Sequence, residues 1–212
     1  MAKQDGAGTR AYQFIKQQLL DGHLEEGTFL TEAALATEVG VSRTPIREAL
    51  QRLDVEKLVT LVPGRGAFIP HVTVRSVYEL MQARELIEVH SIREISMPDP
   101  GLGTELRDIL KKQAKTRQEP VEFIEQDRTF HQLIVNAAGN IVLSELYSSL
   151  RDRQTLLGVR AVKSAQSRVD EVEREHAEIV DAVEAGEREA AIVAVRTHLK
   201  TSTDVLMTGL AS

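Results

Sequence analysis

Apolar residues recur every three or four positions through the first fifty residues, with polar residues between them. This spacing places the apolar side chains on one face of a helix. In the first predicted helix, which ends at Gly22, the apolar positions are Ala11, Ile15 and Leu19. Thr31 and Gly40 have the residue types that begin and end a second helix, and Ser42 is an N-cap candidate for a third. The pattern predicts three short consecutive helices.

The pattern then changes to two short β-prone runs, at 58–62 and 67–69. They flank the run PGRG at 63–66, whose proline and glycines are typical of a turn. The segment therefore predicts a two-stranded hairpin. Three helices followed by a hairpin describe a winged helix-turn-helix. A TetR-like repressor also has a helix-turn-helix, but the predicted hairpin argues against that fold.

From Val74 onward the apolar spacing stays near 3.6 and no strand pattern returns. Helices are expected near 74–96, 104–117, 120–137, 140–160, 167–185 and 187–208, with the run GLGT at 101–104 in a loop. The predicted fold class is mainly α. An N-terminal winged helix-turn-helix domain spans 1–70, a linker spans 71–73, and a C-terminal all-α helical bundle spans 74–212.

The third predicted helix has two different faces. Its apolar stripe consists of Ile46, Leu50 and Leu53. Arg43, Thr44 and Arg47 fall on the opposite side, where the two arginines are one turn apart and can reach neighbouring base edges or phosphates in a major groove. Ser42 and Thr44 can donate to phosphate near the helix N-terminus. This face is a candidate DNA-binding surface.

The predicted hairpin adds a second candidate contact. Arg65 lies between two glycines at its tip, where an arginine can enter a narrow minor groove or contact the phosphate backbone. The alternative is a plain turn with an exposed arginine. The helices that precede the hairpin favour the DNA-binding interpretation.

The net charge of the whole chain argues against DNA binding, but its distribution along the chain is compatible with it. The net charge of the 212 residues is −6, whereas nucleic-acid-binding domains are usually basic. Residues 1–74 nevertheless carry only −1, and the acidic excess lies in 75–212. No cysteine and no apolar run long enough for a membrane span are present. A protein of the cytoplasm, without membrane partners, is therefore expected.

The helix-turn-helix and hairpin also contain a specific motif. It consists of VSRTPIREAL at 41–50, RL at 52–53, LV at 58–59 and PGRG at 63–66. Residues 10–70 thereby resemble the DNA-binding domain of GntR-family transcription regulators. The resemblance implies that Arg43, Thr44 and Arg47 contact an operator, with Gly66 at the wing tip. Many relatives have an arginine where this chain has Ala33, so that contact is absent here.

Four polar side chains interrupt apolar stripes in the C-terminal part. Asp127 and His131 are one turn apart on a single stripe, and His176 and His198 each interrupt another. Burying a polar group without a partner costs about 2 to 7 kcal/mol. Each histidine alone could be a hydrogen-bonded core residue, but one divalent metal would satisfy all four groups. Imidazole and carboxylate ligands suit zinc, which we favour, and also nickel, iron or manganese.

This pattern resembles the FCD-type effector domain of the FadR subfamily, an all-helical bundle whose metal-binding members use one aspartate and three histidines. Asp127, His131, His176 and His198 match those positions in order, within 74–208. Arg84 also lies in an apolar stripe, where it could form an internal salt bridge or hold an effector carboxylate against the metal. Asn136 could line the same pocket or face solvent.

These observations favour a regulator over an enzyme. We expect a homodimer that binds a double-stranded DNA operator and responds to a small carboxylate effector bound at the metal. A metal-dependent enzyme acting on a small organic acid is the main alternative, although no further Asp, Glu or His is clearly placed to act as its base. In a third interpretation the metal is purely structural.

Overall fold

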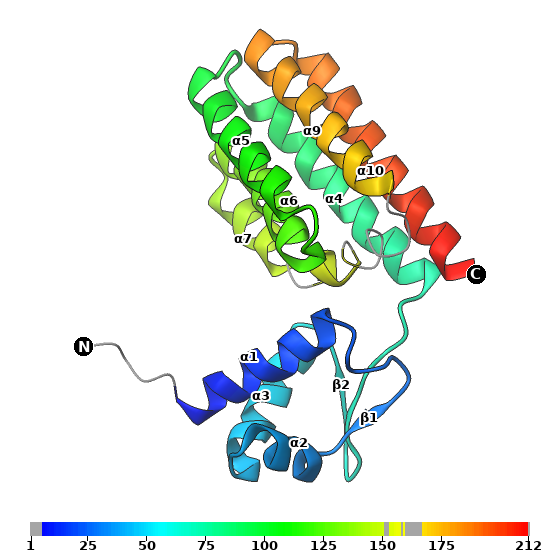
Figure 1. Cartoon of the computed structure of the whole chain (residues 1–212). Helices are drawn as coiled ribbons and strands as arrows, with labels where there is room; N and C mark the ends of the chain where they lie inside the picture. Colours follow the sequence, from blue (N-terminus) through cyan, green and yellow to red (C-terminus); the bar gives the residue numbers. More distant parts are fainter. Residues whose placement is uncertain (1–5, 151–152, 158, 160–166, 212) are drawn as a thin grey trace. The chain divides into compact units, whose positions relative to one another are not determined.

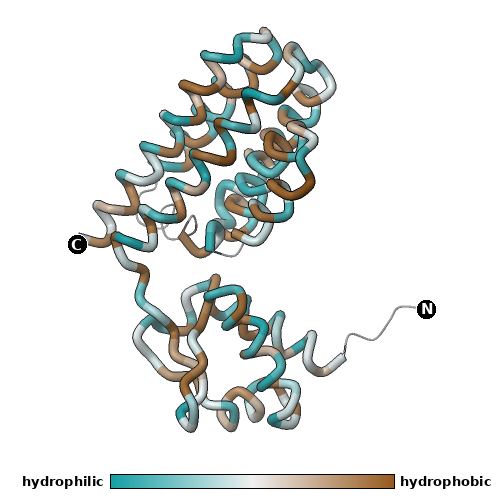
Figure 2. The backbone as a smooth tube through the Cα atoms, turned by 180° about the vertical axis from the view of Figure 1, so that it is seen from behind, coloured by the Kyte–Doolittle hydropathy of each residue, from teal (hydrophilic) through white to brown (hydrophobic). Residues whose placement is uncertain are grey.

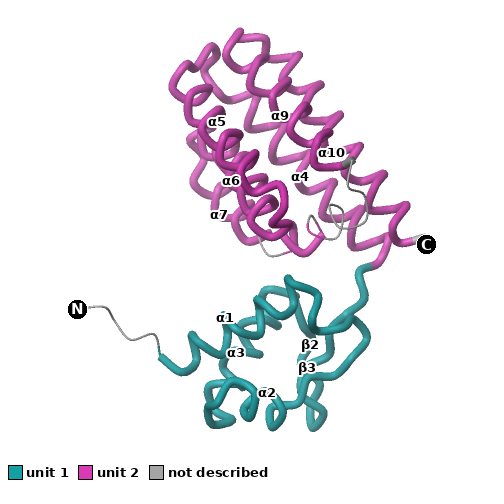
Figure 3. The backbone as a smooth tube through the Cα atoms, viewed as in Figure 1, with its two compact units in different colours: residues 1–72 teal, residues 73–212 magenta. Residues whose placement is uncertain are grey.

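The structure is a computed structural model in which residues 6–150, 153–157, 159 and 167–211 are described. The chain forms two compact units, residues 1–72 and residues 73–212 (Figure 3). Each unit has a buried core of its own.

Unit 1 consists of three helices and a small antiparallel sheet (Figure 1). The helices are α1 (Ala7–Leu20), α2 (Glu32–Val39) and α3 (Arg43–Val55). The strands are β1 (Phe29–Leu30), β2 (Thr60–Val62) and β3 (Gly66–Phe68), in the order β1-β3-β2. The predicted winged helix is therefore confirmed, with β2 and β3 as its hairpin. Strand β1 was not predicted, because two residues are too short to show an alternating pattern.

The apolar stripes of unit 1 meet in one core. Ile46, Leu50 and Leu53 of α3 are buried together with Ala11 and Ile15 of α1. Two capping residues fix the ends of α2 and therefore where the turn to α3 begins. The Thr31 hydroxyl accepts a hydrogen bond from the Ala34 amide at the start of α2, and Gly40 ends α2 with a left-handed φ of 72°. The burial of one side of α3 leaves its polar side exposed.

Unit 2 is a bundle of helices (Figure 1). Its labelled elements are α4 (Val74–Glu94), α5 (Pro100–Gln113), the 3₁₀ turn η1 (Ala114–Thr116), α6 (Pro120–Ala137), α7 (Ile141–Ser149), α9 (Ser167–Ala185) and α10 (Arg188–Ala211). Within the helix expected at 140–160, α7 ends at Ser149, and 153–157 and 159 are helical again. Residues 151–152, 158 and 160 lie outside the described residues. Figure 2 shows hydrophobic and hydrophilic positions alternating along these helices.

The prediction of a loop at 101–104 is wrong. These residues form the first turn of α5, with Pro100 at its start. The Asp99 side chain accepts a hydrogen bond from the Leu102 amide at 2.9 Å. A capping aspartate and a proline at the first helical position outweigh the low helix propensity of two glycines.

Helices α4, α6, α9 and α10 bury large apolar side chains against one another, among them Leu80, Ile92, Phe130, Ile134 and Val183. No helix in the described part of the chain is long and apolar enough to cross a membrane.

Candidate metal centre and DNA-binding face

The exposed face of α3 carries the predicted DNA contacts. Ser42, Arg43, Thr44 and Arg47 are all exposed. Ser42 is the N-cap residue of α3 by position, but its side chain makes no capping hydrogen bond. Its hydroxyl is therefore available to a phosphate.

Arg47 is engaged in a two-point ion pair that the sequence did not predict. Its Nε donates to Glu32 Oε1 at 2.9 Å, and its Nη2 donates to Glu32 Oε2 at 2.9 Å. The paired arginine lowers the pKa of the Glu32 carboxyl, and Glu32 raises the pKa of Arg47. The guanidinium is thus oriented by a carboxylate on the other helix of the helix-turn-helix.

Arg65 and Gly66, the two residues predicted to contact DNA from the wing, have different contacts within unit 1. The guanidinium of Arg65 lies over the Phe29 ring, 4.1 Å from its centroid, in a cation–π contact. Gly66 has a φ of 97°, and a side chain there would overlap the backbone carbonyl of Leu30. The structure therefore gives Gly66 a packing role, because β1 approaches β3 closely at this point.

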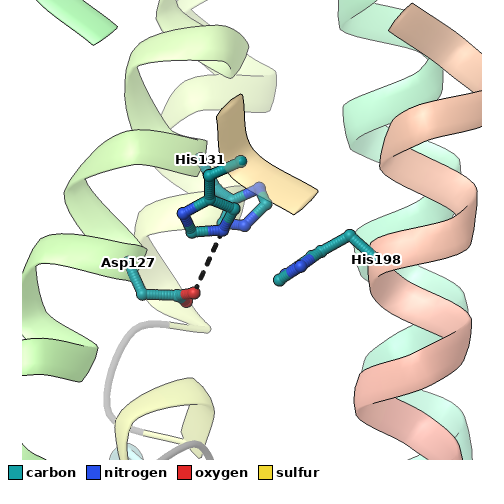
Figure 4. Close-up of side chains that lie close together, drawn as sticks. Asp127, His131 and His198 are labelled. Atoms are coloured by element: carbon teal, nitrogen blue, oxygen red, sulfur yellow. Dashed lines mark ion pairs between the residues drawn. The ribbon is translucent and has the colours of Figure 1, made fainter. Parts of the chain in front are cut away.

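In unit 2 the four predicted ligands come together. Asp127 and His131 lie on α6, His176 on α9 and His198 on α10, and all four are buried. One potential ligand atom from each lies within 4.8 Å of the others. Figure 4 shows the side chains of Asp127, His131 and His198 directed toward one another from their helices.

An oxygen on another helix lies beside the Nδ1 of each histidine. The three contacts are His131 Nδ1 to Glu88 Oε2 at 2.8 Å, His176 Nδ1 to Gln113 Oε1 at 3.1 Å, and His198 Nδ1 to Glu175 Oε2 at 2.8 Å. Carboxylate and amide oxygens accept, so in His176 and His198 the facing Nδ1 carries the proton and Nε2 keeps its lone pair. The His131–Glu88 contact is equally close, but it is not aligned as a hydrogen bond. Such outer contacts are typical of metal-binding histidines.

Two of the remaining nitrogens have unused lone pairs. His131 Nε2 and His176 Nε2 are buried and have no hydrogen-bond partner among the described residues. Asp127 Oδ1 lies 3.3 Å from His176 Nε2. Ligand atoms about 2.1 Å from a metal lie about 3 to 4 Å from one another. Tetrahedral ligand atoms lie about 3.4 Å apart, so the widest separation of 4.8 Å would close by about 1.4 Å around a divalent ion.

The electrostatics agree with this donor set. Burial lowers the pKa of His176, against the raising effect of Asp127, and lowers the pKa of His198 further. Burial by itself would raise the pKa of Asp127, but the close contact with His176 and the nearby His131 and His198 hold it well below its usual range. Neutral imidazoles beside an ionised carboxylate are the protonation states in which these groups bind metals.

Comparisons with known proteins agree with both halves of this description. Residues 7–69 match the family described as "Bacterial regulatory proteins, gntR family", and residues 79–201 match the FCD domain. The chain belongs to the GntR family and carries an FCD domain.

The relatives of this GntR-family regulator include proteins named as transcription regulators. An "Uncharacterized HTH-type transcriptional regulator in unstable DNA locus" from Streptomyces ambofaciens is 34% identical, over 94% of this chain and 86% of the relative. The gluconate operon transcriptional repressor of Bacillus subtilis is 30% identical, over 68% of this chain and 60% of the repressor. The chain is thus a DNA-binding transcription regulator rather than an enzyme.

Solved structures show the same fold. A GntR transcriptional regulator from Rhodococcus sp. RHA1 superimposes with a TM-score of 0.80 at 23% identity, covering 95% of this chain and 97% of that one. At that identity the likeness establishes the fold of this GntR-family regulator, and the roles of its residues rest on their own geometry.

Arg84 forms an internal salt bridge, which is one of the two roles that the sequence allowed. Its partner is Glu88 of the same helix. Arg84 Nε donates to Glu88 Oε1 at 3.0 Å, and the Tyr147 hydroxyl donates to the same oxygen at 2.6 Å. Burial by itself would raise the pKa of Glu88, but His131 and Arg84 hold it well below its usual range. Arg84 also lines a cavity of about 40 Å³ beside Asp127 and His198, so the salt bridge and a ligand contact are compatible.

Asn136 lies away from this cavity. It is exposed at the end of α6, and its side-chain oxygen accepts hydrogen bonds from Gln132 and Ser144. These contacts join α6 to α7. Asn136 therefore has a structural role, and it is not among the residues that line the cavity.

Sequence reasoning missed the three residues that orient the histidines: Glu88, Gln113 and Glu175. All three are buried polar residues. A weak signal was present, since Glu88 is one turn after Arg84 and Glu175 directly precedes His176. Their partners are on other helices, which no local pattern reveals.

Proposed function

We propose that this regulator binds its operator as a homodimer, holds a divalent metal at Asp127, His131, His176 and His198, and changes its operator affinity when a small carboxylate effector binds beside the metal. The observation that carries the metal site is the convergence of four buried groups from three helices, which bring one potential ligand atom each within 4.8 Å of the others. In that arrangement His131 Nε2 and His176 Nε2 have no hydrogen-bond partner among the described residues, and His176 Nε2 lies beside the Asp127 carboxylate. We place the protein in the cytoplasm, where its operator would be.

The DNA-binding role is assigned to the exposed face of α3 and to the wing. Arg43 and Arg47 are one turn apart, so both can reach base edges from one side of the helix. Ser42 and Thr44 are exposed at the helix N-terminus, where their hydroxyls suit phosphate contacts. Arg65 and Gly66 would follow the backbone or minor groove at the wing tip.

The effector role is assigned to the cavity beside the cluster. A bound divalent ion, for which we favour zinc over nickel, iron or manganese, would supply an open coordination position for a carboxylate oxygen. Asp127 and His198 line the cavity, and Arg84 adds a buried guanidinium. An effector changes operator affinity only if it favours one arrangement of the protein over another.

The homodimer is supported by exposed apolar side chains on two helices of unit 2. Leu86 of α4 and Ile141, Val142 and Leu146 of α7 are more than half exposed. Leu86 and Leu146 line the same surface hollow. Exposed apolar patches of this kind are typical of protein interfaces.

The decisive experiment measures metal content and operator binding together. We expect stoichiometric metal in the purified protein, loss of that metal in His131→Ala, and full retention in His90→Ala, which removes an exposed histidine of α4. Operator affinity of the metal-loaded protein is then measured with and without short carboxylic acids.

Full metal content in His131→Ala would refute the site. A metal that is present and needed for stability, together with operator affinity that no acid changes, would instead leave the metal a structural role. Measuring both quantities on one preparation distinguishes these outcomes.

A further inference from the structure

The cavity beside the metal cluster is lined by several polar side chains. Asp127 and His198 lie on the cluster side, with Arg84 among the lining residues. Three further polar residues line the same space: Gln154, Arg168 and Ser202. The rest of the wall is apolar. The cavity is small, at about 40 Å³, so a ligand that enters it must be short.

Gln154 has an unused donor in this wall. The residue is 6% exposed, and its Nε2 is buried without a hydrogen-bond partner in the described ranges. Leaving an amide N–H unpaired in a protein interior is unfavourable, so such a group is either tolerated at a cost or satisfied by a ligand. Because Gln154 lines a cavity, its N–H can meet an acceptor oxygen on a bound molecule.

Ser202 can add a second donor. Its Oγ accepts a hydrogen bond from Arg168 Nη2 at 2.8 Å. A hydroxyl that accepts from an arginine keeps its own proton for another acceptor. Ser202 and Gln154 thus present neutral donors to the cavity.

Arg168 is not available as the partner of a second carboxylate. It is 1% exposed, and it forms a two-point ion pair with Glu175 through Nη1 at 3.0 Å and Nη2 at 2.8 Å. Glu175 in turn orients His198. The guanidinium therefore orders Ser202 and the metal-binding histidine, while its charge is already neutralised.

The charges around the cavity select a single anionic group. Arg84 is paired with Glu88, and Arg168 with the buried Glu175 and the partly exposed Glu171, so among the described charged side chains that line the cavity the Asp127 carboxylate has no arginine partner. A divalent ion beside Asp127 gives one net positive charge, which one carboxylate on the ligand would cancel. A second carboxylate would be buried without a counter-charge, which is strongly unfavourable.

We infer that Gln154 and Ser202, ordered by Arg168, form a subsite for a neutral oxygen, and that the effector is a short hydroxy- or oxo-monocarboxylic acid. This inference rests on the proposed function, which supplies the carboxylate end at the metal. Simple fatty acids would leave Gln154 unpaired, and dicarboxylic acids would add an unbalanced charge.

The test is isothermal titration calorimetry of the metal-loaded full chain with four-carbon probes: butyrate, 3-hydroxybutyrate, 2-hydroxybutyrate and succinate. The 3-hydroxy acid is expected to bind about tenfold more tightly than butyrate, and succinate more weakly than either. The 2-hydroxy acid controls for chelation of the metal by an adjacent hydroxyl. In Gln154→Leu the advantage of 3-hydroxybutyrate over butyrate should disappear while butyrate affinity is unchanged.

Ser202→Ala should reduce the same advantage, and Gln118→Leu, an exposed glutamine, should leave it intact. Tighter binding of succinate, or an equal advantage of the hydroxyl in Gln154→Leu, overturns the subsite while the proposed function stands. If metal is bound but no probe binds, both the effector role and the subsite are overturned. Thermal unfolding of each variant establishes that the comparison is between folded proteins.

Discussion

Arg47 and Glu32 form a bidentate ion pair across the helix-turn-helix, with both nitrogen–oxygen distances at 2.9 Å. The arginine of the recognition helix is therefore held by a carboxylate of the preceding helix before any DNA is present. This geometry orients the guanidinium and also places a negative charge on the DNA-binding face.

Replacing Glu32 with glutamine should separate these two effects. We expect Glu32→Gln to raise affinity for non-specific DNA by about threefold, because a negative charge facing phosphates is removed. The ratio of operator affinity to non-specific affinity should fall, because Arg47 loses its orientation. Fluorescence anisotropy with both DNAs at one salt concentration measures the ratio. Glu38→Gln, an exposed glutamate of the same helix, controls for charge, and an unchanged ratio in Glu32→Gln would contradict the orienting role.

Removing Arg47 itself should weaken operator binding. Arg47→Ala is expected to lower operator affinity by about 5- to 150-fold if the side chain reads a base. The loss should depend on the operator sequence, which distinguishes base reading from a phosphate contact. Arg174→Ala, which removes an exposed arginine of α9, should bind like the parent protein in the same titration. Equal affinity of Arg47→Ala and the parent would remove Arg47 from the interface.

The wing offers a matched pair of glycine substitutions. Gly64→Ala should lower the free energy of unfolding by about 1 kcal/mol, because an alanine would adopt a left-handed φ of 73° in open space. Gly66→Ala should cost about 3 kcal/mol, because its φ is also left-handed and its new side chain would overlap the Leu30 carbonyl. Urea unfolding followed by circular dichroism checks the order. Equal losses would show that β1 moves to accommodate the side chain.

The outer contact of His198 should control metal affinity. Glu175→Gln is expected to weaken metal binding by about 10- to 100-fold, because the amide no longer fixes the imidazole with a charge. Competition with a chromophoric chelator measures this change. Glu171→Gln serves as control, since Glu171 also contacts Arg168 and does not orient a histidine. Equal affinities of the two variants would place Glu175 outside the metal site.

Chelation should destabilise the protein through the same site. With free metal at about a hundred times its dissociation constant, bound metal stabilises the native state by about 3 kcal/mol, which a chelator removes. Differential scanning calorimetry with and without chelator should show a lower Tm for the parent. Asp127→Asn should show a much smaller change. The same shift in both proteins would locate the metal elsewhere.

Local sequence patterns determined most of the fold. The stripe of Ile46, Leu50 and Leu53 predicted the orientation of α3, and PGRG predicted the hairpin. The interruptions of apolar stripes by Asp127 and the histidines singled out the buried cluster. These features are encoded within one or two turns of chain, because the faces of helices and strands repeat with fixed periods.

The partners of these residues were decided only by the tertiary structure. Gln113 is 63 positions from His176, and Glu175 is 23 from His198. Arg84 has a glutamate one turn away, yet only the packing of α4 against α6 makes that glutamate also face His131. A periodic pattern shows which side of a helix is buried, but which side chain it meets depends on helix packing across the bundle. The sequence therefore determined the elements and the unusual buried groups, and the tertiary structure decided how those groups are paired.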